Sequence, residues 1–202
     1  MPRTITNMQD IIFQLDHRIF FLINRIWTNS FFDTFLPLFR DKFFWLPLYV
    51  FIFSFLIVNY RKQGWLIILF LIITVTLSDQ FSSHLIKPLV HRLRPCKDPF
   101  FTEYVRTIVG CKPGFSFPSS HAANHFSVAF FLGLFFFRQA RWVLPAGLVW
   151  AAIISYSQIY IGVHYPSDII AGCFLGIFCA LLSFSLFTFF LSRFGIILSR
   201  KT

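Results

Sequence analysis

The chain has 202 residues, of which 56% are hydrophobic and only 13% are charged. Its mean hydropathy of +0.69 is too high for a soluble domain of this length, so the sequence predicts a single integral membrane domain over 1–202. The net charge of +10 indicates anionic partners. Because the basic residues lie between apolar runs rather than along one polar face, lipid or phosphate anions are favoured and nucleic acid is not expected.

The apolar runs predict an all-α membrane helical bundle. Residues 11–39 are Phe-rich but repeatedly interrupted by charges, which is typical of an amphipathic interfacial helix, with a first (sixth in total) transmembrane helix as the alternative. After it, five clear transmembrane helices are expected, over 43–60, 65–87, 119–137, 142–162 and 166–191. Residues 88–118 form the long polar connection between the second and third of these helices.

Basic residues orient the bundle. The turns at 61–62 and 138–141 and the C-terminal tail with Arg193, Arg200 and Lys201 carry no acidic residue. The positive-inside rule therefore places them in the cytoplasm. We expect a multi-pass protein of the inner (plasma) membrane with 88–118 on the periplasmic or extracellular side. On that side Cys96 and Cys111 would meet an oxidising environment, where they either form a disulfide or stay free.

Two cations open the outer connection. Lys87 and Arg94 are seven residues apart, which is two helical turns and one face, and together they suit a phosphate dianion. The alternative is that both side chains only reach toward lipid headgroups. Asp79 lies about two turns before Lys87 and is expected to pair with or position a cation, unless it is merely a polar residue at a helix end.

A second polar cluster, Pro118-Ser119-Ser120-His121, opens the helix expected over 119–137. Free backbone N–H groups at a helix N-terminus bind anions, and His121 just inside can donate a proton to a leaving oxygen. The alternative is an ordinary capped helix start. His121 and His125 also have a spacing that can chelate zinc, but no Glu or Cys cluster supplements them, so no metal is expected.

The third cluster lies between two apolar runs, where His164 precedes Asp168 by four residues. Pro166 suits the first turn of a helix, which places Asp168 one turn from His164. A carboxylate that holds one imidazole nitrogen leaves the other as nucleophile or base. A polar helix–helix junction is the alternative. Taken together, the three clusters favour phosphoryl transfer through a phosphohistidine.

Lys87-(six residues)-Arg94-Pro95, Pro118-Ser119-Ser120-His121 and Ser157-Gln158-(five residues)-His164-(three residues)-Asp168 resemble the three signature motifs of the type-2 phosphatidic acid phosphatase superfamily, which includes the vanadium-dependent haloperoxidases. The resemblance covers 79–172. It implies that His164 is the nucleophile, that Asp168 orients it and that His121 is the general acid. It also implies that Lys87, Arg94 and the Ser119–Ser120 backbone bind phosphate without a metal or other cofactor, and that vanadate inhibits.

The chain departs from these motifs at two positions. Ser120 replaces the glycine of the usual Pro-Ser-Gly-His, and Gln158 stands where an arginine is usual. Gln158 is expected to contact phosphate through hydrogen bonds without supplying charge. Loss of a charged donor can cost several kcal/mol in the transition state. Either another cation compensates, with Arg92 and Arg106 as candidates, or the enzyme is slower or tuned to another substrate.

The resemblance implies a membrane lipid phosphatase that acts on the phosphomonoester or pyrophosphate of a lipid. The short chain and compact outer loop resemble small undecaprenyl-diphosphate phosphatases, so undecaprenyl diphosphate is the favoured substrate. Phosphatidylglycerophosphate, phosphatidic acid and lipid A remain alternatives, as does a non-catalytic protein that binds or transports lipid phosphate. The expected partners are the lipid substrate and the phospholipid bilayer, and no obligatory protein partner is evident.

Overall fold

A computed structural model describes residues 8–41, 43–99, 101–111 and 113–198, and Arg200 and Lys201 of the predicted basic tail lie outside this range. The described residues form an all-α fold. Its α-helices are α1 (Met8–Phe21), α2 (Ser30–Arg40), α3 (Leu46–Tyr60), α4 (Lys62–Gln80), α5 (Lys87–Val90), α6 (Ser120–Phe136), α7 (Val143–Tyr160) and α8 (Pro166–Arg193).

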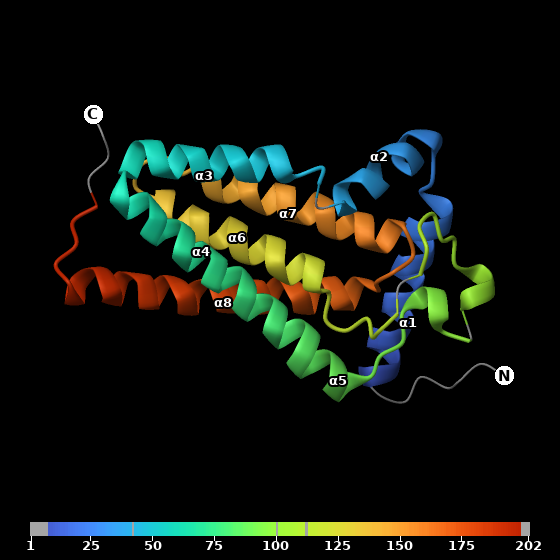
Figure 1. The fold of residues 1–202 in the computed structure, drawn as a ribbon. Helices are drawn as coiled ribbons and strands as arrows, with labels where there is room; N and C mark the ends of the chain where they lie inside the picture. The colour runs from blue at the N-terminus through green and yellow to red at the C-terminus, as the bar shows by residue number, and fades with distance from the viewer. Residues whose placement is uncertain (1–7, 42, 100, 112, 199–202) are drawn as a thin grey trace.

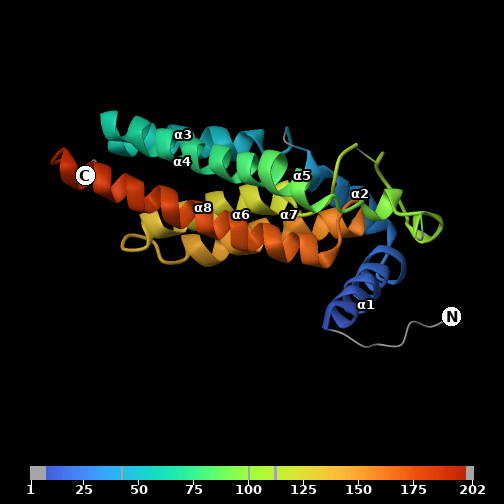
Figure 2. The same cartoon turned by 90° about the horizontal axis from the view of Figure 1, so that it is seen from below.

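Five of the helices build the bundle. Helices α3, α4, α6, α7 and α8 run side by side along the length of the molecule, while α1, α2 and the connection that follows α5 gather at one end (Figure 1). Seen from below, α1 lies at that same end and leans away from the long helices (Figure 2). The turn between α3 and α4, which contains Arg61, and the turn between α6 and α7, which contains Arg138, lie at the opposite end (Figure 1).

Among the residues that the structure describes, three helices are long and apolar enough to cross a membrane. They are Lys62–Val90, Val143–Tyr160 and Pro166–Arg193. The first combines α4 and α5 through a π-helical turn at Phe81–Ile86, so it extends past the predicted 65–87 at both ends. Helices α3 and α6 are shorter, with 15 and 17 residues. The expected number of five crossings therefore stays a prediction.

The N-terminal segment 11–39 is divided rather than continuous. After α1 and a π-helical turn at Leu22–Ile26, a new helix begins because the Asn29 side chain accepts a 2.9 Å hydrogen bond from the Phe32 N–H. Helix α1 buries Asp16 and exposes Ile12 and Phe13. This inverted pattern suits a helix whose outer face meets lipid, which supports the predicted interfacial position.

Small residues let α6 and α8 approach closely. A side chain at Gly172 would place its Cβ 2.5 Å from the Ser119 carbonyl oxygen, and one at Gly176 would collide with the Ala123 carbonyl. The approach allows the Ser119 N–H to donate to the Asp168 carbonyl at 2.9 Å. The second and third sequence clusters are thereby joined.

The outer connection is fixed to the bundle by one buried amide. Asn24 donates to the Tyr160 carbonyl at 2.7 Å and to the Arg106 carbonyl at 2.8 Å, and it accepts from the Arg106 N–H at 2.8 Å. Three chain segments thus share one fully buried side chain whose donors and acceptor are satisfied. The same connection contains a disulfide between Cys96 and Cys111, whose Cα atoms are 6.0 Å apart.

Candidate active site

His164 lies in the turn between α7 and α8, and its side chain is only 2% exposed. Its Nδ1 is 3.4 Å from Oδ2 of Asp168, which sits in the first turn of α8. The same carboxylate oxygen accepts the Tyr165 N–H at 2.9 Å, which fixes its position. A carboxylate on the Nδ1 side favours the tautomer that leaves a lone pair on Nε2.

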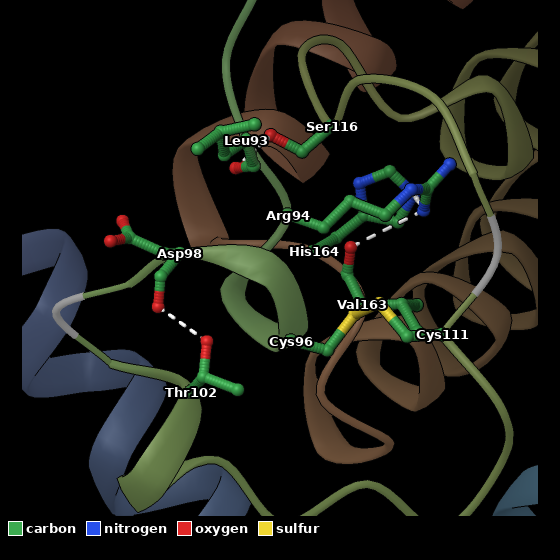
Figure 3. The surroundings of a disulfide bond; sticks show 9 residues. All are labelled: Leu93, Arg94, Cys96, Asp98, Thr102, Cys111, Ser116, Val163 and His164. Carbon is green, nitrogen blue, oxygen red and sulfur yellow. Dashed lines mark hydrogen bonds between the residues drawn. A yellow bond between two sulfur atoms is a disulfide. The ribbon is translucent and has the colours of Figure 1, made fainter.

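Arg94 lies on the Nε2 side of this imidazole. Its Nη1 is 3.4 Å from His164 Nε2 and 3.4 Å from the Val163 carbonyl oxygen, and the disulfide of Cys96 lies close by (Figure 3). The Nε atom of Arg94 is buried and has no hydrogen-bond partner in the described structure. Unused guanidinium donors beside the nucleophilic nitrogen are suited to a phosphate oxygen.

Lys87 reaches the start of α6. Its Nζ donates to Oγ of Ser120 at 2.9 Å, and the hydroxyls of Ser82 and Ser83 each lie 3.0 Å from the same oxygen. Glycine at position 120 would offer none of these contacts. Ser120 therefore connects the first cluster to the second, in addition to the phosphate contact predicted for it.

Asp79 makes no ion pair within the described residues. Its Oδ1 accepts hydrogen bonds from Ser83 at 3.4 Å and from Asn124 at 3.3 Å. Asp79 therefore acts on Lys87 without an ion pair, through electrostatic attraction and through Ser83, which contacts the Ser120 hydroxyl that accepts from Lys87.

The polar groups of Ser119 are already hydrogen-bonded, whereas the side chain of His121 lies near His164. The Ser119 hydroxyl caps α6 by accepting from the Ala122 N–H at 3.4 Å, and its own N–H is already used by the Asp168 carbonyl. In this state the Ser119 amide is not free for phosphate, unlike the expectation from sequence. His121 lies in the first turn of α6, close enough to interact electrostatically with His164.

Gln158 points along its own helix. Its side-chain amide donates to the Ile154 carbonyl at 3.5 Å and to the Ser157 hydroxyl at 3.2 Å. Its backbone carbonyl accepts the N–H groups of Val163 and His164, which closes the turn that carries the histidine. The predicted phosphate contact of this buried side chain stays a prediction.

Arg92 and Arg106, the candidates to replace the missing charge, are both ion-paired. Arg92 donates to Asp168 at 2.8 Å and to Asp16 at 2.5 Å, and Arg106 pairs with Asp33. Burial alone would lower the pKa of Arg92, but the carboxylates of Asp168 and Asp16 outweigh it and raise that pKa. Arg92 thus pairs with Asp168, the carboxylate of the candidate site.

A family model described as the PAP2 superfamily matches residues 63–191, which is more than half of the chain. The chain belongs to the PAP2 superfamily. It is 35% identical over 173 residues to a lipid A 4'-phosphatase of Bacteroides thetaiotaomicron, covering 84% of this chain and 75% of that protein. It is 28% identical over 183 residues to an undecaprenyl-diphosphatase of Sulfolobus acidocaldarius, covering 90% and 82%.

The fold agrees with this assignment. The crystal structure of Aquifex aeolicus LpxE superimposes with a TM-score of 0.68 and 25% sequence identity, covering 85% of this chain and 95% of that one. Together with the apolar helices, these likenesses identify a membrane PAP2 lipid phosphatase. Both the predicted family and the predicted enzyme class are confirmed.

Asp16 is a residue of this PAP2 site that sequence reasoning missed. Its Oδ1 accepts the Ser167 N–H at 2.8 Å, and its Oδ2 accepts from the Ser167 hydroxyl at 2.7 Å and from Arg92. It therefore caps the start of α8 from α1, 151 residues away, and holds the arginine that pairs with Asp168. An acid in a Phe-rich amphipathic segment gave no signal of this contact.

We expect Asp16→Asn to lower kcat about tenfold with little change in KM. The amide weakens the charged bond to Arg92, which is worth about 1.5–3 kcal/mol, and so loosens Asp168. Asp33→Asn is the matched control because it breaks the Arg106 ion pair, which does not contact Asp168. Steady-state kinetics of both variants test this, and equal effects on kcat would show that Asp16 is only structural.

The His164 imidazole is expected to stay neutral through mildly acidic pH. Burial lowers its pKa to about 4, with Asp168 opposing the shift and the cations Arg94 and Lys87 adding to it. A free histidine titrates near pH 6.5, so the shift keeps the Nε2 lone pair available well below that pH and loses it only as the pH falls through about 4. NMR of 13C-labelled histidine, assigned with His164→Gln, measures this, and a titration midpoint near 6.5 would contradict it.

The histidine pair of α6 has its own contacts. His125 Nδ1 lies 2.8 Å from the His121 carbonyl oxygen, and its Nε2 lies 3.4 Å from the Tyr49 hydroxyl. In the part of the chain that the structure describes, no three His, Cys, Asp or Glu residues gather as a metal site. Among these residues, no third side chain is therefore placed to bind zinc together with His121 and His125.

Proposed function

We propose that this PAP2 phosphatase removes a phosphate monoester group from lipid A. The observation that carries the proposal is the meeting of Lys87, Arg94 and the His164–Asp168 pair at one end of the bundle. The choice of lipid A over other lipids is supported by the 35% identity to a lipid A 4'-phosphatase across 84% of the chain. It replaces undecaprenyl diphosphate as the favoured substrate.

The proposed reaction has two displacement steps. Nε2 of His164 attacks phosphorus while the bond to the ester oxygen breaks, and His121 gives its proton to that leaving oxygen. Water then attacks the phosphohistidine, with His121 accepting its proton, and phosphate and neutral His164 are released. Arg94 and Lys87 hold the phosphoryl oxygens, on which negative charge develops, and Asp168 stabilises the Nδ1–H side throughout.

We further propose that the site faces the periplasm or cell exterior from the inner (plasma) membrane. The basic turns that contain Arg61 and Arg138 lie at the end of the bundle opposite the site. The positive-inside rule assigns those turns to the cytoplasm. The disulfide of Cys96 and Cys111 supports the same orientation, since such bonds persist in oxidising compartments.

Undecaprenyl diphosphate is the second candidate substrate. The undecaprenyl-diphosphatase of Sulfolobus acidocaldarius covers 90% of the chain, a larger share than the lipid A 4'-phosphatase covers, although its identity is lower. The same residues can carry out this reaction, with the leaving oxygen belonging to a phosphate instead of a sugar.

The test is phosphate release by the purified protein in detergent from lipid A, undecaprenyl diphosphate, phosphatidic acid and phosphatidylglycerophosphate. We expect kcat/KM to be highest for lipid A, by about tenfold or more, which corresponds to about 1.4 kcal/mol. A chelator in every assay should leave turnover unchanged, because no proposed step needs a metal. Preference for undecaprenyl diphosphate would transfer the assignment to the second candidate, and no turnover of any lipid would overturn both.

A further inference from the structure

In the described part of the chain, Arg40 is a cation without a counter-charge. It is the last residue of α2, its side chain is half-buried, and within the described residues it has no hydrogen bond and no carboxylate within 4 Å. Burial lowers its pKa, so its partial desolvation is not offset as it is for Arg92. A half-buried charge with no partner is unfavourable unless a ligand supplies the opposite charge.

The position of Arg40 connects it to the proposed site. It lines a cavity of about 380 Å³ together with His121, the proposed general acid. The pKa of Arg94 is lowered first by burial and next by the positive charge of Arg40, so the two guanidinium groups lie within electrostatic reach of each other. Two cations within this reach repel each other, and an anion bound between them would relieve the repulsion.

The same cavity has an apolar wall. Beyond Arg40, His121 and Asn124 it runs along side chains of α3 and α4, namely Ile52, Phe53, Leu71, Ile72 and Val75. A cavity with cationic and imidazole groups at one end and aliphatic groups along its side matches the chemistry of a phosphorylated lipid. Arg40 therefore lies where the phosphate of such a molecule would be expected.

We propose that Arg40 binds the scissile phosphate and supplies, from α2, the positive charge that Gln158 does not provide. The proposal rests on the proposed phosphatase function. Lys87, Arg94 and Arg40 then contact the phosphate from three different segments of the chain. Because the negative charge on the equatorial oxygens must be held in the pentacoordinate transition state, the loss of Arg40 affects both turnover and vanadate binding.

The closing experiment compares Arg40→Gln, Arg40→Lys and the control Arg25→Gln, which removes an exposed arginine of the same N-terminal segment. For Arg40→Gln we expect about a 10²-fold loss in kcat/KM and a similar rise in the Ki of orthovanadate. Arg40→Lys keeps the charge without the planar fork and should recover about tenfold of that loss. Arg25→Gln should match the wild type.

A measurement on the wild-type protein removes any dependence on variant folding. Phenylglyoxal modifies arginines, and mass spectrometry of each peptide gives the rate at Arg40 with and without orthovanadate. We expect vanadate to slow modification of Arg40 and leave Arg25 unchanged. If vanadate inhibits turnover but neither Arg40 labelling nor the Arg40→Gln kinetics respond, the Arg40 proposal is wrong and the phosphatase function stands. If the wild type shows no turnover and vanadate protects no arginine, the proposed function fails and the Arg40 proposal fails with it.

Discussion

His164→Ala is expected to abolish phosphate release, by on the order of 10⁴-fold or more in kcat, because it removes the proposed nucleophile. No neighbouring group replaces it in the described structure: Asp168 lies on the far side of the imidazole, and Arg94 is a cation. Phosphate release from the preferred lipid measures the loss. Quenching the reaction of wild-type protein with labelled substrate should also trap an acid-labile phosphoenzyme, which the variant cannot form.

His84→Ala is the matched control for this prediction. His84 is an exposed histidine in the turn between α4 and α5, outside the proposed site. It should retain wild-type turnover and a wild-type phosphoenzyme signal. If His164→Ala keeps more than a few per cent of activity with an unchanged melting temperature, the phosphohistidine mechanism is wrong.

Motif spacing predicted much of the site because it encodes local geometry. Pro166 begins a helix, and the first turn of that helix brings Asp168 next to His164. The structure forms this predicted contact between His164 and Asp168. The prediction that Lys87 and Arg94 share one helical face was wrong, because α5 ends at Val90, His91 is left-handed and Arg94 is extended. The helix period fixes relative positions only as far as the helix itself continues.

Contacts made by the N-terminal segment were not predicted. Asp16 and Arg40 lie on short helices. The sequence pattern of such a helix is the same whether its charges face lipid headgroups or the rest of the protein. Their partners are far away in sequence, as in the bond from Asp16 to Ser167, and no period in the sequence encodes such a separation. From the sequence, Gln158 predicted either a compensating cation or a slower or differently tuned enzyme. The candidate cations were Arg92 and Arg106, because nothing in the sequence shows that carboxylates already pair with both.

The positions of the helices were predicted from the sequence, but one of their ends was not. Hydropathy predicted five apolar segments, and the structure has a helix at each one. Hydropathy did not predict that the second helix continues through Pro88 to Val90. The chain stays helical there because a π-helical turn precedes the proline. The first turn of a helix tolerates a proline, since its missing N–H has no partner to lose there.

Asp168→Asn is expected to lower kcat by about 10³-fold, through the tautomer of His164. In the wild type, Oδ2 accepts from the Tyr165 N–H and faces His164 Nδ1, and Oδ1 accepts from Arg92. An asparagine has one acceptor oxygen for these positions. With its NH₂ toward the histidine it also faces the Tyr165 N–H and favours a proton on Nε2, where the nucleophilic lone pair is needed. With its NH₂ toward Arg92 it opposes a guanidinium with a donor.

The size of the expected loss follows from what the asparagine leaves unchanged. It keeps the shape of the side chain, so substrate binding and KM should change little, whereas the attacking lone pair is lost in the favoured tautomer. Glu103→Gln neutralises an exposed carboxylate of the same outer connection and should retain wild-type kcat. A kcat for Asp168→Asn within tenfold of the wild type would mean that the carboxylate does not set the His164 tautomer. A rise in KM at constant kcat would instead make Asp168 a residue that shapes the binding site through Arg92.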